Sequence, residues 1–233
     1  MLAPVRVLLI SNSGRPFLQH CRGAIAVFLG AARRVGFVTA ANLDDEEGYC
    51  ELARAALGPE PTGLTVEHLR WDRDFQSTLA RAEAIFVGGG NTYALLRRLR
   101  ESGLLDAIGE RARAGLPYIG SSAGANVAGP NILTTNDWNV VGLTAFGGLG
   151  LVPFNINPHY KETDPVMAPG SETRDERIAE YLFARDNPVV GIEEGTLVRV
   201  EEGVATVLGT GRVKVFVRRR APRWFAAGEQ LAF

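Results

Sequence analysis

The feature that most constrains this chain is residues 117–126, where an apolar strand-like run leads into a serine placed between glycines. The segment 120–124 reads Gly-Ser-Ser-Ala-Gly, which matches G-x-S-x-G with Ser122 at its centre. This pattern is typical of a nucleophile elbow, a sharp strand-to-helix turn in which a larger side chain at either glycine would clash. Ser121 lacks glycines at the matching positions and is the weaker candidate. The same pattern also occurs in simple turns of small residues, so its meaning depends on the rest of the chain.

The composition is that of an ordinary globular protein. The chain has 233 residues, 46% of them hydrophobic and 22% charged, which is enough for one sizeable core. We therefore predict a single domain over residues 1–233. The net charge of -1 gives no bulk attraction to nucleic acid or to an anionic membrane, and the basic run at residues 217–220 is best explained as a solvated strand end. We predict a small-molecule partner, and the sequence leaves the oligomeric state open.

The sequence gives no sign of a metal, a cofactor or export. Cys21 and Cys50 form no C-x-x-C pair and have no histidine cluster beside them, so neither a disulfide framework nor a zinc site is predicted. The apolar run at residues 7–10 is too short for a signal-peptide core or a membrane span. We expect a cytoplasmic protein that uses no metal and no cofactor.

Short apolar runs alternate with helix-period segments along the first half of the chain. Strands are predicted at residues 5–10, 35–39, 64–67 and 84–87, and helices at residues 20–29, 49–57 and 75–81. This alternation is typical of a mostly parallel sheet with helices on its faces. The predicted fold class is therefore α/β.

The second half of the chain changes character. Alternating segments separated by glycine turns, at residues 196–200, 204–208 and 213–217, predict an antiparallel meander at one edge of the sheet. Residues 163–171 contain two prolines and one glycine and show little periodicity, so they are predicted to form an exposed loop, which is a candidate lid.

Three glycines at residues 88–90 follow a predicted strand and precede an amphipathic helix. Such glycines allow backbone N–H groups to approach an anion, so the segment could cradle a phosphate or form half of an oxyanion hole. The Lys-Ser/Thr of a P-loop and the spacing of a dinucleotide fingerprint are missing. With an elbow serine on a later strand, the oxyanion hole fits better, while a flexible junction is the structural alternative.

A serine nucleophile requires a base, and the chain has three histidines. His159 is the best placed, because it follows a predicted strand end and a proline that stiffens the backbone. His20 and His68 both lie far upstream of the elbow. An ordinary surface or core imidazole is the structural alternative for His159.

Two carboxylates are candidates for the acid that would orient this histidine. Asp137 gives the chain order Ser, Asp, His that is familiar from α/β-hydrolases. Glu194 ends a predicted strand and precedes a glycine, which is where active-site residues of open α/β sheets gather. The spacing does not choose between them, and either could be an ordinary turn residue.

Several segments, in order along nearly the whole chain, resemble the peptidase E family of aspartyl dipeptidases. They are residues 9–13, 87–92, 118–126, 134–137, 156–159, 172–174 and 194–195. The resemblance implies a glutamine-amidotransferase-like α/β fold. It also implies a serine peptidase that cleaves dipeptides with an N-terminal aspartate, here called Asp-X, through an acyl-enzyme, so that the expected partner is a small peptide.

Carried onto the matching motifs, the resemblance implies a complete catalytic set. Ser122 corresponds to the nucleophile and His159 to the general base. The backbone N–H groups of Gly90 and Ala123 correspond to the oxyanion hole. For the third member, the resemblance admits both Asp137 and Glu194, and we favour Glu194 as the orienting acid.

The resemblance also implies a substrate-binding set. Arg174 corresponds to the group that pairs with the aspartate side chain of the substrate, in keeping with the forked binding of carboxylates by guanidinium. Thr173 and Asn91 are further substrate-binding candidates. Asp137 is expected to lie close to the site.

The chain departs from the family pattern in three places. Ser121 stands where the family usually has a bulky aromatic residue, residues 37–41 lack an expected proline, and the loop between His159 and Arg174 differs in length. We expect Ser121 in particular to make the specificity differ from that of relatives. Two alternatives therefore stay open: a serine peptidase with another acidic-peptide specificity, carboxypeptidase-like or cyanophycinase-type, and a non-catalytic α/β binding module.

Overall fold

The structure, a computed structural model, describes residues 5–162 and 170–233, so most of the candidate lid at residues 163–171 lies outside the described residues. The strands are β1 (Val7–Ile10), β2 (Arg34–Val38), β3 (Thr65–His68), β4 (Ala84–Val87), β5 (Tyr118–Ser121), β6 (Asn155–Asn157), β7 (Val189–Ile192), β8 (Thr196–Glu201), β9 (Val204–Gly209), β10 (Val213–Phe216) and β11 (Arg223–Phe225). The helices are α1 (Arg22–Leu29), α2 (Glu46–Leu57), α3 (Gln76–Arg81), α4 (Thr92–Glu101), α5 (Leu104–Arg113), α6 (Ala123–Ala128) and α7 (Arg174–Ala184).

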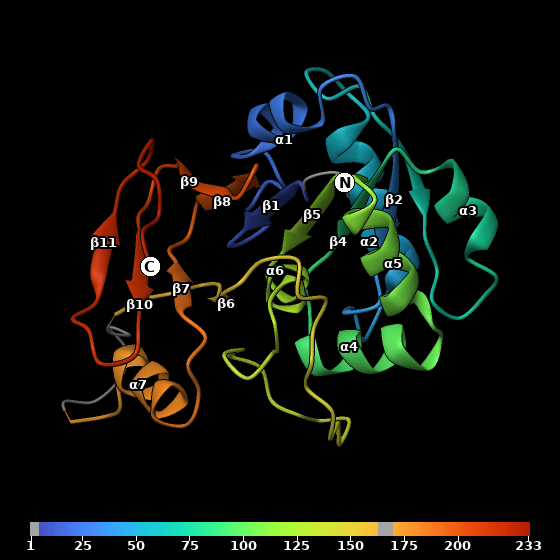
Figure 1. The fold of residues 1–233 in the computed structure, drawn as a ribbon. Helices are drawn as coiled ribbons and strands as arrows, with labels where there is room; N and C mark the ends of the chain where they lie inside the picture. Colours follow the sequence, from blue (N-terminus) through green and yellow to red (C-terminus); the bar gives the residue numbers. More distant parts are fainter. Residues whose placement is uncertain (1–4, 163–169) are drawn as a thin grey trace.

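A seven-stranded sheet with the order β3-β2-β4-β5-β1-β8-β9 forms the larger part of the molecule (Figure 1). Its first five strands are parallel, and β8 and β9 continue it in antiparallel pairing. Every residue of β1, β4 and β5 is buried, because α1 and α2 cover one face and α3 to α6 cover the other. The predicted α/β class with a mostly parallel, helix-flanked sheet is thus confirmed.

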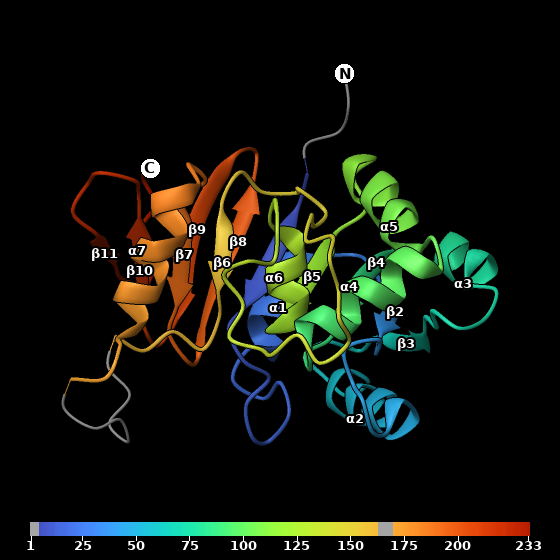
Figure 2. The same ribbon diagram turned by 90° about the horizontal axis from the view of Figure 1, so that it is seen from below.

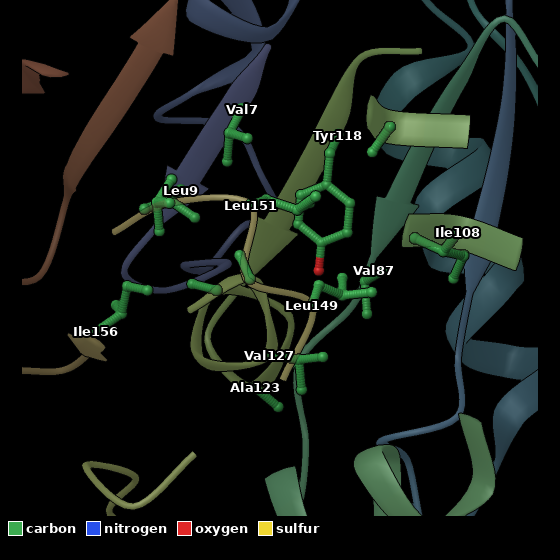
Figure 3. Close-up of a cluster of buried hydrophobic side chains, with 14 of the residues drawn as sticks. Val7, Leu9, Val87, Ile108, Tyr118, Ala123, Val127, Leu149, Leu151 and Ile156 are labelled. Carbon is green, nitrogen blue, oxygen red and sulfur yellow. The ribbon is translucent and has the colours of Figure 1, made fainter. Parts of the chain in front are cut away.

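The centre of the core anchors the strand that ends at the elbow. Figure 3 shows the Tyr118 ring of β5 among Val87, Leu149 and Leu151, which belong to the same buried cluster. Its hydroxyl donates a 2.7 Å hydrogen bond to the backbone carbonyl of Gly124 in α6. Burial raises the pKa of Tyr118, so the phenol stays a neutral donor. This bond ties the start of α6 to the strand that precedes it.

A second, four-stranded sheet with the order β11-β10-β7-β6 lies beside β8, with α7 packed against it (Figures 1 and 2). β6 and β7 pair in parallel, whereas β10 pairs antiparallel with both β7 and β11. The three predicted tail strands all form, but they do not make one meander. β8 and β9 extend the large sheet, and β10 joins the second sheet because its register on β7 buries all four of its residues.

The other predicted boundaries differ from the structure by a few residues. The helix predicted at residues 49–57 begins at Glu46, because the Asp45 side chain accepts a hydrogen bond from Gly48 N and caps it. The helix predicted from residue 20 begins at Arg22. Among the described residues, no helix has both the length and the apolar character needed to cross a bilayer. The prediction of a single domain stays a prediction.

Candidate active site

Ser122 occupies a strained turn between β5 and α6. Its φ of 52° and ψ of -108° are conformations that non-glycine residues rarely adopt. Added Cβ atoms at the flanking glycines would lie 2.4 Å from the Gly124 carbonyl oxygen (at Gly120) and 2.1 Å from the Val87 carbonyl oxygen (at Gly124). Both glycines are therefore required by backbone contacts, and the strand-turn-helix context of the G-x-S-x-G pattern is present.

The structure brings Ser122, His159 and Glu194 into one hydrogen-bonded line. The Ser122 Oγ atom lies 2.8 Å from His159 Nε2, and His159 Nδ1 lies 2.7 Å from Glu194 Oε1. Glu194 lies in the turn between β7 and β8. The side chains of His159 and Glu194 are 40% and 41% exposed, so the histidine is open to a substrate.

Ser11, the residue that follows β1, connects the backbone of His159 to the end of β7. His159 has a φ of 53°, and its N–H donates a 2.9 Å hydrogen bond to Ser11 Oγ. The Ser11 hydroxyl in turn donates to the Ile192 carbonyl at 2.8 Å. Ser11 is fully buried, so this contact fixes the strained histidine backbone against two strands.

Asp137, the alternative acid, is hydrogen-bonded elsewhere. Its Oδ2 atom accepts from the backbone N–H of Thr92 at 2.7 Å and from the Thr92 hydroxyl at 2.6 Å, and the Thr135 hydroxyl lies 3.2 Å away. Thr92 is the first residue of α4, so the carboxylate sits at a helix N-terminus, where negative charge is stabilised. In the described structure the acid that contacts His159 is Glu194.

The glycine loop after β4 passes beside the serine. A Cβ atom at Gly89 would lie 3.1 Å from Ser122 Cβ. Gly90 has a φ of 135°, and a Cβ atom there would lie 2.2 Å from the Ala41 carbonyl oxygen. Gly90 thus cannot be replaced without moving the loop, and Ala123, the first residue of α6, is fully buried on the other side of the serine.

Asn91 follows this loop and acts as a helix cap. Its Oδ1 atom accepts from Ala94 N at 2.9 Å, and its Nδ2 atom donates to the Trp138 carbonyl at 3.0 Å. Its side chain therefore ties α4 to the loop that carries Asp137. A direct contact with substrate, as the sequence predicts, stays a prediction.

A tyrosine that the sequence does not single out holds the glycine loop. The Gly89 N–H donates a 2.8 Å hydrogen bond to the Tyr49 hydroxyl, which is itself hydrogen-bonded to Ser13. Ser13 Oγ lies 3.0 Å from Ser121 Oγ. Burial raises the pKa of Tyr49, which keeps this phenol neutral. Ser121 is fully buried, so its side chain lies behind the site and not on the surface that a substrate would touch.

Arg174 is the first residue of α7 and lines a cavity of about 170 Å³. The guanidinium donates a hydrogen bond to Asn136 Oδ1, which also accepts from Asn157 Nδ2 at 2.7 Å. Asn136 Nδ2 donates to the Pro158 carbonyl at 2.8 Å, immediately before His159. The asparagine thereby connects the arginine to the segment that carries the histidine.

Thr173 precedes Arg174 and caps the same helix. Its hydroxyl accepts from Glu176 N at 3.2 Å, and the Glu176 carboxylate accepts from Thr173 N at 2.6 Å, which completes a capping box. Thr173 therefore fixes where α7 begins. In this way it helps to set the position of Arg174, and a direct substrate contact stays a prediction.

Sequence reasoning missed several residues that support the site. Ser11 and Asn136 lie inside segments that carry the family resemblance, but no sequence pattern pairs either of them with His159 or Arg174. Tyr49 lies within a predicted helix and has no motif signal at all. Within the described part of the chain, no group of three or more His, Cys, Asp or Glu side chains is gathered as a metal site.

Comparisons with known proteins find relatives along nearly the whole chain. The family model for peptidase family S51 matches residues 7–208. Peptidase E of Streptomyces coelicolor is 42% identical over 231 residues, which covers 98% of this chain and 94% of the relative. A probable alpha-aspartyl dipeptidase of Drosophila melanogaster is 45% identical over 222 residues, covering 93% and 91%.

Solved structures show the same fold. The chain is similar to a crystal structure described as a peptidase E protein from Listeria monocytogenes, with a TM-score of 0.70 and 26% identity over 90% of this chain and all of that one. A peptidase from an acI-B1 Actinobacterium, at 18% identity and a TM-score of 0.76, covers 99% of this chain and 98% of that one and shares the fold. The match of the family model to residues 7–208, together with these relatives, shows that this chain belongs to peptidase family S51.

Proposed function

We propose that this protein is a serine dipeptidase that hydrolyses Asp-X through an acyl-enzyme. The observation that carries the proposal is the line from Ser122 Oγ through the His159 imidazole to the Glu194 carboxylate, with contacts of 2.8 and 2.7 Å. Nucleophile, base and orienting acid in this geometry define the serine triad on any fold. The names of the relatives, peptidase E and alpha-aspartyl dipeptidase, support the substrate class.

In the acylation step, Ser122 Oγ attacks the peptide carbonyl carbon while His159 Nε2 accepts the hydroxyl proton. Glu194 accepts the Nδ1–H hydrogen bond, which fixes the tautomer and stabilises the imidazolium. The carbonyl oxygen becomes an oxyanion that receives hydrogen bonds from the backbone N–H groups of Gly90 and Ala123. One such donor is typically worth about 2.7 to 4 kcal/mol.

The intermediate then collapses and the peptide C–N bond breaks. The protonated His159 gives its proton to the departing amine, and the aspartyl group remains esterified to Ser122. In deacylation, His159 removes a proton from water, the hydroxide attacks the ester carbonyl, and Ser122 recovers its proton as aspartate leaves. The histidine exposure of 40% leaves room for both the amine and the water.

We propose the cavity beside Arg174 as the subsite for the aspartate side chain. A guanidinium binds a carboxylate through two parallel hydrogen bonds, and Asn136 and the Thr173 cap define the position of Arg174. The cavity of about 170 Å³ is of a size for a short side chain. A lysine would keep the charge but lose the fork, so Arg174→Lys is the informative substitution.

The central test compares Ser122→Ala with the unaltered protein on Asp-Leu. We expect loss of hydrolysis with an unchanged melting temperature, and labelling of the unaltered protein alone by a fluorophosphonate probe. A binding module would not be labelled. Retained hydrolysis by Ser122→Ala would exclude this nucleophile, and a fall in rate with a chelator would indicate a metal mechanism.

The substrate class is tested with Arg174→Lys on Asp-Leu and Asn-Leu. We expect a large loss on Asp-Leu and little change on Asn-Leu, because only the first carries the side-chain carboxylate. Equal losses on both would make Arg174 structural. A panel that includes β-linked aspartyl-arginine would distinguish the cyanophycinase-type alternative.

We also propose that the protein acts in the cytoplasm on free small peptides, without nucleic acid or membrane partners. Both cysteines are buried free thiols, as expected in a reducing compartment. Fractionation with a compartment marker tests the location.

A further inference from the structure

The nucleophile and the base of the candidate triad come from different sheets. Ser122 follows β5 of the large sheet, whereas His159 follows β6, which is an edge strand of the second sheet (Figure 2). Among the described strands, β6 pairs with β7 alone, so its other side is held by contacts outside the sheet. The 2.8 Å contact between Ser122 Oγ and His159 Nε2 therefore depends on what holds the segment after β6 in place.

The loop that follows α6 supplies these contacts. The Thr134 hydroxyl donates a 2.8 Å hydrogen bond to the Ile156 carbonyl in the middle of β6. The buried Asn157 side chain donates from Nδ2 to the Thr134 carbonyl at 2.7 Å and to Asn136 Oδ1 at 2.7 Å. Both amide hydrogens of Asn157 are thus used, and Asn136 is attached directly to the end of β6.

Asn136 also contacts the surroundings of two functional residues. Its Oδ1 atom accepts from Arg174 as well as from Asn157, and its Nδ2 atom donates to the Pro158 carbonyl at 2.8 Å. Donors on one side of the amide and an acceptor on the other decide which atom is the oxygen. One side chain therefore touches both the proposed binder of the aspartate side chain and the residue before the base.

The peptide group between Pro158 and His159 is held at both ends. Its carbonyl oxygen accepts from Asn136 Nδ2, and its N–H donates to Ser11 Oγ at 2.9 Å. The φ of 53° at His159 is a conformation that persists only where surrounding contacts fix it. Without Asn136, one of these two contacts is lost, and the imidazole is no longer held at a fixed distance from Ser122 Oγ.

We propose that Asn136 is a positioning residue that couples recognition of the aspartate side chain to the placement of His159. The inference rests on the proposed Asp-X hydrolysis and deepens it. Through Oδ1, Asn136 holds Arg174 where the substrate carboxylate binds, and through Nδ2 it holds the peptide group that orients the base. Loss of Asn136 should therefore weaken substrate binding and also slow the chemical step.

The first test measures kcat and KM of Asn136→Ala on Asp-Leu and Asn-Leu. We expect kcat to fall by about 10-fold to 100-fold on both substrates, because a small misplacement of a catalytic group has an effect of this size. KM should rise on Asp-Leu alone, because only Asp-Leu carries the side-chain carboxylate. A role confined to the subsite would leave kcat on Asn-Leu unchanged and would overturn the proposal.

Asn139→Ala is the matched control, because it removes the same side chain from the same loop. In the described structure, the hydrogen bonds of the Asn139 side chain go to the backbone of Leu143, at 2.8 Å each. It should leave kcat and KM unchanged on both substrates. Losses in Asn139→Ala equal to those in Asn136→Ala would reduce the effect to general loosening of the loop and overturn the proposal.

The second test measures the rate at which a fluorophosphonate labels Ser122. The probe has no aspartate side chain, so its rate reports on the activation of Ser122 by His159 and not on Arg174. Labelling should be slowed in Asn136→Ala. It should be slowed equally in Asn136→Asp, whose ionised carboxylate keeps an acceptor for Arg174 but has no donor for Pro158. Asn136→Asp is nearly the same size as the original residue, so it carries the test if Asn136→Ala does not fold.

The third test combines Asn136→Ala with Arg174→Lys. Independent residues would give a loss of kcat/KM on Asp-Leu equal to the product of the two single losses. We expect a smaller combined loss, because Asn136 acts partly through Arg174. Losses that multiply, or unchanged labelling in a folded Asn136→Asp protein, would overturn the proposal. Absence of Asp-Leu cleavage by the unaltered protein would instead refute the proposed function, while the labelling rates would still test the placement of His159.

Discussion

The Asp137 carboxylate accepts hydrogen bonds from both the backbone N–H and the hydroxyl of Thr92, at 2.7 and 2.6 Å. This places it on the first turn of α4, while the Glu194 carboxylate lies 2.7 Å from His159. The two acids that sequence spacing leaves equivalent therefore have different hydrogen-bonding partners. Substitutions at the two positions should affect different properties.

Glu194→Gln should lower kcat by about 100-fold to 10,000-fold, because an amide can hold the imidazole in the wrong tautomer. The unfolding free energy of Glu194→Gln should change little, since the Glu194 side chain is 41% exposed. Asp137→Asn should instead cost about 0.5 to 2 kcal/mol of unfolding free energy, as loss of a helix cap does, and keep most of the activity. Steady-state kinetics and urea denaturation of both variants check this, and a reversed pattern would make Asp137 the orienting acid.

The hydrogen bond from the Gly89 N–H to the Tyr49 hydroxyl predicts that Tyr49 helps to stabilise the transition state. Tyr49→Phe removes the acceptor of a 2.8 Å hydrogen bond in the loop that carries the proposed oxyanion donor Gly90. We expect kcat to fall about 10-fold with KM nearly unchanged, and stability to fall by about 1 kcal/mol. A peptide aldehyde should lose affinity in parallel with kcat/KM. Phe17→Leu, which alters the ring contact of Tyr49 without touching its hydroxyl, is the control.

A buried lysine links the segment that follows His159 to the start of α7. The Lys214 ammonium lies 2.6 Å from both Glu162 and Asp175, its side chain is only 6% exposed, and Asp175 also accepts a hydrogen bond from Tyr160. Lys214→Met removes the ammonium partner of both carboxylates, and because Glu162 is 55% exposed and Asp175 keeps its hydrogen bond from Tyr160, the loss should be about 1 to 3 kcal/mol of unfolding free energy. Urea denaturation measures it, with the exposed Lys161→Met as control. Equal, small losses in the two variants would contradict the role of this ion pair.

The same network should influence substrate binding. Asp175 follows Arg174, and Tyr160 follows His159, so the pair fixes the two segments relative to each other. We expect a higher KM for Asp-Leu in Tyr160→Phe, with a smaller change in kcat. An unchanged KM in a folded Tyr160→Phe protein would show that other contacts fix the relative positions of the segments that carry His159 and Arg174.

His68 predicts how stability depends on pH. Its ring nitrogens lie 2.8 Å from Thr39 Oγ1 and 3.2 Å from Glu47, and burial is the largest effect and lowers its pKa below the usual value of about 6.5. Between the lowered value and 6.5, the unfolded chain binds more protons than the folded one, so stability rises with pH. The stability contributed by neutral His68 is complete above pH 6.5 and is lost as the pH falls.

The measurement is the unfolding free energy from pH 5 to 8 in the unaltered protein and in His68→Gln. The variant should show a flatter slope below pH 6.5. His20, whose pKa burial also lowers, titrates in the same range, so part of the slope should remain. An identical slope in both proteins would show that His68 does not titrate differently on folding.

The sequence by itself determined the α/β class, the strand-turn-helix at Ser122 and the short set of candidate catalytic residues. Strand runs such as β4 are apolar throughout because both faces are covered, and this is visible in one dimension. The glycines around Ser122 are also readable, because backbone contact at Gly120 and Gly124 tolerates no side chain.

Only the tertiary structure decided which carboxylate meets His159, which strands share a sheet and what supports the site. Asp137 and Glu194 are both turn acids in the sequence. The difference arises because β7 pairs with β6, which brings the Glu194 turn that follows β7 beside His159, which follows β6. β10 leaves the expected meander because β7 offers it a buried partner. Contacts such as those of Ser11, Tyr49 and Asn136 join residues far apart in the chain, and local sequence patterns carry no information about such distances.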